Sequence, residues 1–151
     1  MNEEEIEKTE EEIKSDNEKL LNGFWDWLTE KGLKTATKNK HCSNVDFYIN
    51  WFLCNYESLE AKAGCYEVGR FLGDFFIRKA MWSTPNSTKS TATSIKKFYR
   101  YMLEVGKIDK SDYNFLCSTI KSDMPEWLKR MERYNDPDVE YEDYLEEFFL
   151  F

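Results

Sequence analysis

Histidine is almost absent from this chain of 151 residues, since His41 is the only one. Mechanisms that need several histidines are therefore excluded, and no phosphate-binding glycine loop, zinc-protease motif or serine-hydrolase motif is found. The many carboxylates lie in acidic runs, which are typical of solvated surface rather than of paired acid and base catalysts. Ser90, Ser94 and Lys97 form a serine–lysine grouping, but the capped start of a helix explains these residues far better than catalysis does. We expect no enzymatic activity, no metal and no cofactor.

Glycine and proline are also scarce, with six and three residues respectively, which disfavours an all-β protein with many turns. No apolar run approaches the ~20 residues that span a bilayer. The N-terminal sequence MNEEEIEKTEEEIK is acidic and lacks the basic and apolar regions of a signal peptide. We therefore expect a cytoplasmic protein without membrane association.

The four cysteines, Cys42, Cys54, Cys65 and Cys117, show no C-x-x-C spacing. Disulfide frameworks and metal sites usually show paired spacings. The pattern favours buried, reduced thiols, which behave as small hydrophobic residues. The alternative is a zinc site that begins at His41 and Cys42, but the sequence offers no second pair of ligands.

Charge is unevenly distributed along the chain. The formal net charge is −8, yet residues 1–33 carry −7, residues 34–110 carry +6 and residues 111–151 carry −7. Two stretches contain no acidic residue at all, 31–45 and 75–103. Their cations are Lys31, Lys34, Lys38 and Lys40 in the first stretch, and Arg78, Lys79, Lys89, Lys96, Lys97 and Arg100 in the second. Such stretches are either solvated helix faces or basic patches for an anionic partner.

Apolar periodicity predicts helices over residues 15–31, 35–56, 65–81 and 94–105. A Ser/Thr-rich loop is predicted over 82–93, and one or two short helices separated near Pro125 follow Gly106. No strand-rich segment or repeat is present. We expect an all-α bundle of four to five helices over residues 16–134, with an acidic extension over 1–15 and an acidic, aromatic tail over 135–151.

The segment 94–108 is the most informative of these. Its apolar side chains recur at i, i+3, i+4 and i+7 and predict a core-facing stripe. Extending this helix backwards places polar and basic residues on one opposite stripe. That stripe consists of Lys89, Thr93, Lys96 and Arg100, with Lys97 beside it.

Two motifs in this order resemble the SAM-like core-binding domain of tyrosine recombinases, which include phage integrases. The first is WLTEKGL, with Trp27, Leu28, Gly32 and Leu33, followed by a Ser/Thr-containing turn and an aromatic helix. The second ends the basic helix, with Phe98, Tyr99, Arg100, Tyr101, Met102, Gly106 and Ile108. The resemblance covers about residues 17–120. It implies a SAM-like helical bundle that forms half of a clamp around duplex DNA during integration and recombination.

In that family, the start of the second helix and the fourth helix contact the DNA, and these positions coincide with the two acid-free stretches. The resemblance therefore implies DNA contacts at Lys34, Lys38, Lys40, Lys89, Thr93, Lys96, Lys97 and Arg100. Cations at these places would bind mainly phosphates. The catalytic domain that follows in the family, with its Arg, Lys, His and Tyr of strand cleavage, is not found here. The resemblance thus implies a non-catalytic module that acts with or against an intact recombinase.

Two other interpretations stay open. The chain could be a protein–protein interaction module that kept the fold and lost DNA binding, because both ends are acidic and the tail is rich in aromatic side chains. That tail would then bind a partner or a second copy of the chain, unless it packs on its own domain. A third interpretation is a piece of a longer recombinase, which the acidic, aromatic end disfavours.

Overall fold

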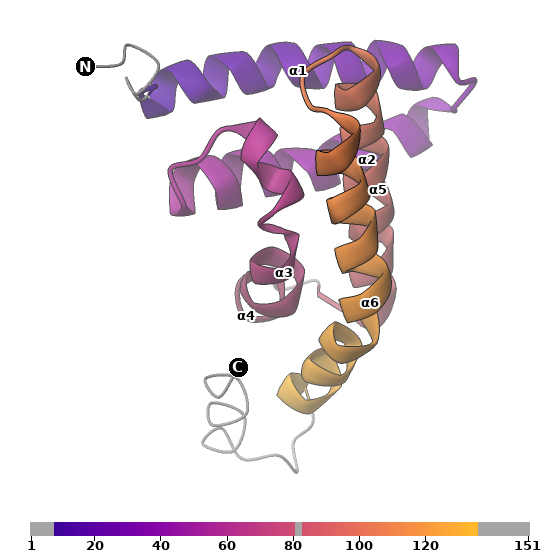
Figure 1. Cartoon of the computed structure of the whole chain (residues 1–151). Helices are drawn as coiled ribbons and strands as arrows, with labels where there is room; N and C mark the ends of the chain where they lie inside the picture. Colours follow the sequence, from indigo (N-terminus) through magenta and orange to yellow (C-terminus); the bar gives the residue numbers. More distant parts are fainter. Residues whose placement is uncertain (1–7, 81–82, 136–151) are drawn as a thin grey trace.

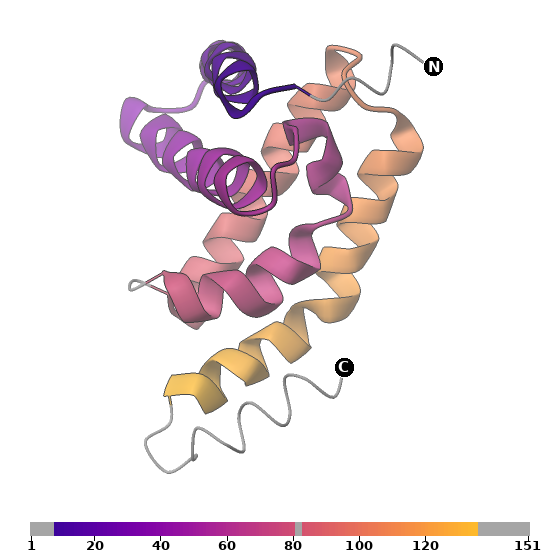
Figure 2. The same cartoon turned by 90° about the vertical axis from the view of Figure 1, so that its left-hand side faces the viewer.

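The computed structural model describes residues 8–80 and 83–135, and every regular element within these ranges is helical. The long helices form two antiparallel pairs, and one pair runs across the other (Figure 1, Figure 2). The first pair is α1 (Glu10–Glu30) and α2 (Thr35–Asp46), which continues directly as η2 (Phe47–Tyr56). The second pair is α5 (Pro85–Glu104) and α6 (Lys110–Asn135). The expected helical bundle is confirmed.

Short helical segments lie between the two pairs and complete the core. They are η3 (Ala61–Cys65), a 3₁₀ helix, and the continuous run α3 (Val68–Arg70), η4 (Phe71–Phe75) and α4 (Phe76–Lys79). The predicted third helix, 65–81, therefore starts later than expected, with a 3₁₀ turn before it. Ring contacts join all layers: Phe24 of α1 meets Phe98 of α5 edge-on at 5.4 Å, and Tyr48 meets Phe71 at 4.7 Å. Such pairs stabilise a core beyond the area they bury.

Two segments of the core are wound as π-helices. These are η2 and η4, and their aromatic side chains face one another. The Phe52 ring lies 5.2 Å from that of Phe71 and 5.0 Å from that of Phe75, measured between centroids. Because π winding is rare and less favourable than α winding, we attribute its persistence here to this ring packing. The helix predicted over 35–56 is present, but its second half has this wider winding.

The first helix begins earlier than its sequence pattern indicates. Thr9 is the N-cap, and its side chain and that of Glu12 form a reciprocal capping box, an arrangement worth about 1 kcal/mol. Ile13 is buried against the bundle. The helix therefore starts at Glu10 rather than near residue 15, and the predicted extension 1–15 supplies part of the core. Residues 1–7 of that extension lie outside the described residues.

The predicted loop over 82–93 is largely helix, because α5 begins at Pro85 behind the N-cap Thr84. Thr84 and Ser87 form a second capping box. Hydroxyl groups further along α5 donate to carbonyls one turn back, as Thr88 does to Thr84 and Thr93 does to Lys89. Because these hydroxyls find partners within the helix, a Ser/Thr-rich segment can be helical here.

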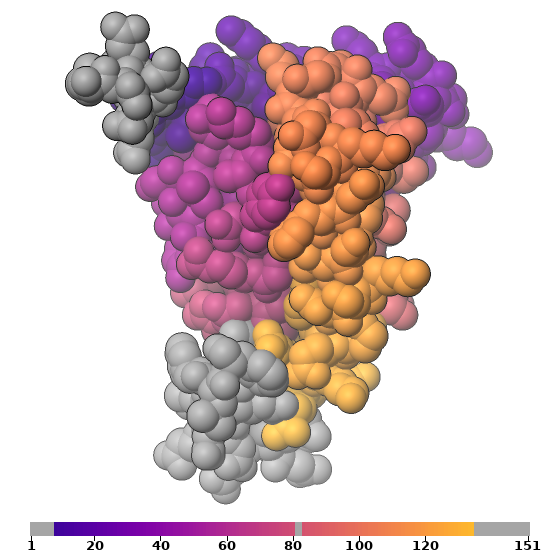
Figure 3. All heavy atoms as spheres, viewed as in Figure 1, coloured from indigo at the N-terminus to yellow at the C-terminus, as the bar shows by residue number. Residues whose placement is uncertain are grey.

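The last helix continues through Pro125, where a break was predicted. A proline inside a helix costs about 3 kcal/mol. Beyond it, Trp127 and Met131 are buried in the core, and each such side chain contributes about 1.5–3 kcal/mol. Figure 3 shows α6 packed along the segment that precedes α5. A Cβ atom on Gly73 would lie 2.7 Å from Trp127 Cδ1, so only glycine allows this approach.

Candidate nucleic-acid interface

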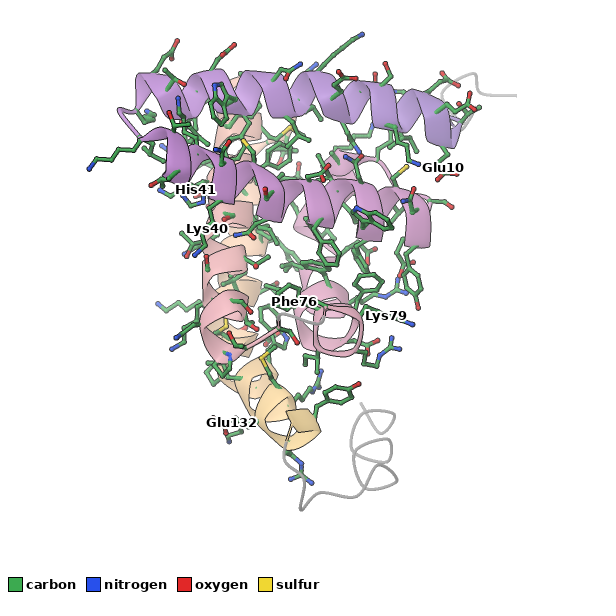
Figure 4. The ribbon with its side chains drawn as sticks, turned by 180° about the vertical axis from the view of Figure 1, so that it is seen from behind. Glu10, Lys40, His41, Phe76, Lys79 and Glu132 are labelled. Carbon is green, nitrogen blue, oxygen red and sulfur yellow. The ribbon has the colours of Figure 1, made fainter. Side chains whose placement is uncertain are left out.

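The two acid-free stretches meet where α2 packs against α5. Figure 4 labels Lys40 and His41 at this place, on the side of α2 next to α5. His41 Nδ1 lies 2.7 Å from Ser94 Oγ, and Asn44 Nδ2 donates to the same hydroxyl over 3.0 Å. Residues about fifty positions apart in the sequence are thus joined by direct hydrogen bonds. We call His41, Asn44 and Ser94 the polar junction.

Electrostatic effects at the polar junction show that both stretches contribute charge to it. Burial, and then the positive charges of Lys97 on α5 and Lys40 on α2, lower the pKa of His41 below its usual value near 6.5. The imidazole is half-buried and Ser94 is fully buried. The buried Ser94 hydroxyl is not accessible as a nucleophile, so the serine–lysine grouping has a structural explanation.

The outer face of α5 carries the stripe that the sequence predicts. Lys89, Thr93 and Arg100 are exposed, and Lys96 and Lys97 are half-buried. The Thr93 hydroxyl already donates to the Lys89 carbonyl over 3.0 Å, so it would have to rotate before it could donate to a phosphate. The stripe lies opposite the core residues of the same helix, which include Ile95, Phe98, Tyr99 and Met102.

The basic residues of the second helix separate into two kinds. Lys34, the N-cap of α2, and Lys40 are exposed. Lys38 is only 8% exposed, and its ammonium group donates to Thr29 Oγ1 over 2.9 Å. It also lies 4.3 Å from the centroid of the Trp25 ring. Lys38 therefore connects α2 to α1, and its charge faces the protein rather than a ligand.

Arg100 differs from the lysines of the stripe because it already has an anionic neighbour. Its guanidinium lies 3.4 Å from the Glu104 carboxylate and 5.8 Å from the centre of the Tyr113 ring. Glu104 also accepts a hydrogen bond from the Trp27 indole, which lowers the pKa of this carboxyl group. Within the described residues, no lysine of the two stretches has a carboxylate within 4.0 Å. Five of these lysines belong to α2 with its N-cap or to α5 and are exposed or half-buried. They are Lys34, Lys40, Lys89, Lys96 and Lys97. We call these five lysines, together with Thr93 and Arg100, the basic face.

Not every cation of the acid-free stretches belongs to this face. Arg78 and Lys79 end α4, and Figure 4 shows Lys79 on the opposite side of the view from Lys40. Arg78 pairs with Asp74. The acid-free residues 75–103 thus lie on two separate surfaces, and only the surface of α5 adjoins α2.

His41 and Asn44 are part of the polar junction, although charge counting did not select them. Both lie within the first acid-free stretch, and Asn44 is placed one helical turn from both Lys40 and His41. Their position in the acid-free stretch could therefore have identified His41 and Asn44, but nothing in the sequence places Ser94 beside them. That contact depends on how α5 crosses α2.

Other kinds of site find little support in the part of the chain that the structure describes. No group of three or more His, Cys, Asp or Glu side chains is arranged to hold a metal ion there. All four cysteines are free; Cys54 and Cys65 are buried, and Cys42 and Cys117 are half-buried. No described helix has the length and apolar character that a membrane crossing requires.

Two open grooves indent the described surface, one beside Trp51 and the other beside Tyr101. Neither is lined by serine, threonine, cysteine or histidine. The basic face thus remains the strongest candidate for a functional site.

Comparison with known proteins adds no relative, because the chain matches no protein-family model, no curated protein and no solved structure.

Proposed function

We propose that the basic face binds the phosphate backbone of duplex DNA, and that the chain is a non-catalytic module related to the core-binding domain of tyrosine recombinases. The observation that carries this proposal is the meeting of two acid-free stretches at one helix crossing, where Lys40 and Lys97 both act on His41. Five lysines of this face lack an anionic partner in the described structure. Lysines bound to the phosphates would displace condensed counterions from the DNA, and the resulting entropy favours the complex.

The proposed contacts are those of the sequence prediction without Lys38. Lys34 and Lys40 supply charge from α2, and the α5 stripe supplies the remainder. Because lysine ammonium groups recognise phosphate as point charges, these contacts position the duplex and carry little sequence information. Binding should therefore tolerate many sequences and weaken steeply with salt. A module that shares its DNA target with an intact recombinase would either assist that enzyme or compete with it for the same site.

The proposal is tested by fluorescence anisotropy of a labelled duplex across a salt titration. The full chain should bind, with an affinity that falls as salt rises by a slope of about −0.9 per phosphate contacted. The double variant Lys96→Glu/Arg100→Glu should abolish binding. The matched control is Lys62→Glu/Lys79→Glu, which reverses two exposed lysines on η3 and α4. Circular dichroism would establish that both variants keep their helices. Unchanged binding by the first variant would refute the proposal.

A protein–protein interaction module is the second candidate, and one surface feature favours it. Tyr66 and Phe115 are 51% and 49% exposed, and their rings lie 4.7 Å apart between centroids. The Tyr66 hydroxyl donates to Asp112 over 2.6 Å, which holds the ring in place. Ordered, exposed aromatic pairs are common in binding surfaces. The tail that first suggested this candidate, 136–151, lies outside the described residues. Failure of the full chain to bind DNA at low salt would favour this second function.

A further inference from the structure

His41 lies between Lys40 and Lys97 of the proposed DNA-binding surface and is hydrogen-bonded to Ser94. The Ser94 hydroxyl has one proton, and it donates to the Ser90 carbonyl over 3.2 Å. The same oxygen accepts from Asn44 Nδ2 over 3.0 Å. A serine oxygen can accept two hydrogen bonds, so its remaining lone pair faces His41 Nδ1 at 2.7 Å. With the Ser94 proton assigned to the Ser90 carbonyl, neutral His41 carries its proton on Nδ1, and its Nε2 is unprotonated.

The unprotonated Nε2 is on the side of the ring away from Ser94. No described residue bonds to it, and it is not among the buried polar atoms that lack a partner, so solvent reaches it. The charged groups that act on the ring are Lys97 from α5 and Lys40 from α2; no carboxylate of the described residues does so. In this state Nε2 can accept a hydrogen bond but cannot donate one to an anion.

We propose that His41 is itself a phosphate contact, and that it binds duplex DNA in its protonated form, so that formation of the complex takes up one proton. The inference rests on the proposed function and adds to it a binding residue and a dependence on pH. Protonated Nε2 would donate to a phosphate oxygen that Lys40 and Lys97 also attract, and Nδ1 would keep its bond to Ser94.

The direction of the pH effect follows from linkage. In the free protein, burial and the two lysines oppose protonation of His41. A phosphate at Nε2 would favour the imidazolium, so the pKa of His41 is higher in the complex than in the free protein. Between these two pKa values the complex binds more protons than the free protein, and affinity rises as the pH falls. Each unit of difference corresponds to about a tenfold gain in affinity.

Because the chain has one histidine, NMR reports on this group without ambiguity. The Cε1–H signal of His41 would be titrated between pH 5 and 8, first in the free full-length protein and then with saturating duplex. We expect a midpoint below 6.5 without DNA and a midpoint about one unit higher with it. The same midpoint in both states would show that no phosphate acts on the ring, and that result would overturn the inference.

The second measurement is duplex affinity by anisotropy at pH 5.5 and 7.5, at constant salt. The test variant is His41→Asn, whose amide can still donate to Ser94 but cannot gain a charge. The control is Lys89→Gln, which removes an exposed cation from the start of α5. We expect the native chain and the control to bind about tenfold tighter at the lower pH. The His41→Asn variant should lose this gain and match the native chain at pH 7.5.

The outcomes separate the inference from the function on which it rests. If the native chain and His41→Asn both bind in a salt-sensitive way and depend equally on pH, the chain binds DNA but His41 is not one of its contacts. Binding that does not change with pH in the native chain would lead to the same conclusion. Absence of binding by the native chain at either pH, even at low salt, would overturn the proposed function together with the inference.

Discussion

The ammonium group of Lys38 lies over the indole ring of Trp25, with Nζ 4.3 Å from the ring centroid. The same nitrogen donates to Thr29, one turn further along α1. A lysine that the family resemblance assigns to a DNA contact is thus used to hold the first two helices together. Lys40, two residues away, is exposed and has no such partner.

This difference predicts opposite behaviour for two matched variants. Lys38→Met should reduce the free energy of unfolding by about 1–2 kcal/mol, because a largely desolvated cation–π contact and a hydrogen bond are lost. Its DNA affinity should stay within about twofold. Lys40→Met should leave stability unchanged, weaken binding and reduce the salt slope by about one. Urea unfolding and anisotropy measure the two quantities; a loss of affinity confined to Lys38→Met would contradict the assignment.

Glu104 is an acidic residue beside the cations of α5, where it pairs with Arg100 and accepts from Trp27. Its lowered pKa keeps it ionised at neutral pH. Glu104→Gln keeps an acceptor for the indole but removes the negative charge. We expect duplex affinity to rise about threefold at low salt and the difference to fade as salt screens the charge. Weaker binding by this variant would indicate that the DNA binds to a surface other than the one beside Glu104.

The C-terminal segment 136–151 contains seven acidic residues and no basic one. The helix that precedes it ends beside the start of α5, where Thr88 Oγ1 lies 3.4 Å from Met131 Sδ. The described part of α6 therefore approaches the start of α5, which carries Lys89. We expect a chain that ends at residue 135 to bind duplex about tenfold tighter at low salt, because anionic residues compete with phosphate for the same cations.

The control for this prediction keeps the length of the segment and replaces its acids by Asn and Gln. It should bind as tightly as the shortened chain. Equal affinity of the full and shortened chains would show that the segment does not reach the basic face. Analytical ultracentrifugation of the same proteins tests the second candidate function, because loss of self-association on shortening would indicate docking to another copy.

Two buried tyrosines hold the 3₁₀ segment η3 against the core. Tyr99 donates to the Ala61 carbonyl and Tyr48 to the Gly64 carbonyl, each over 2.6 Å. Tyr99→Phe should cost about 1–2 kcal/mol of unfolding free energy, because it removes the buried bond to the Ala61 carbonyl. Gly64→Ala should cost more, since its Cβ would overlap the Tyr99 hydroxyl. Thermal or urea unfolding would check both; a Gly64→Ala variant of native stability would contradict this packing.

The effect of pH on stability follows from His41. Its pKa in the folded chain is below the value near 6.5 expected when unfolded, chiefly through burial. Below about pH 6.5 the unfolded chain therefore binds more protons than the folded chain. The contribution of His41 to the free energy of unfolding is complete above about pH 6.5 and is lost as the pH falls through the folded pKa. His41→Asn should remove that part of the pH dependence, as measured by urea unfolding at pH 5 and 7.5.

Lys97→Gln provides an independent check on the electrostatics of the same residue. Lys97 disfavours the imidazolium, so its replacement should raise the pKa of His41 toward 6.5. The NMR titration of the single histidine measures this directly. The matched control is Lys79→Gln, which changes an exposed lysine on α4 and should leave the titration unchanged. A fall in the His41 pKa in the Lys97 variant would be inconsistent with the described geometry.

Local sequence patterns were sufficient to predict most of the helices. The apolar stripe of Ile95, Phe98 and Met102 has the periodicity of α5, and these residues are buried as expected. The patterns were insufficient at element ends. Residues 85–93 look like a loop because hydroxyl side chains compete with helical hydrogen bonds, and Pro125 looks like a break because it lacks an N–H group. In both places contacts with distant residues, Thr88 with Met131 and Trp127 with Gly73, favour the helix.

Helical periodicity and charge are local properties, so the sequence alone was enough to indicate the helices of the described residues, the basic middle of the chain and its two acid-free stretches. It did not determine which of those cations face solvent. Lys38 and Lys40 have the same charge and lie on the same helix, and only the packing of α1 against α2 buries one of them. The crossing of α2 and α5 likewise brought His41 to Ser94. Such contacts join residues far apart in the chain, and burial and hydrogen bonding between them arise only when the helices pack.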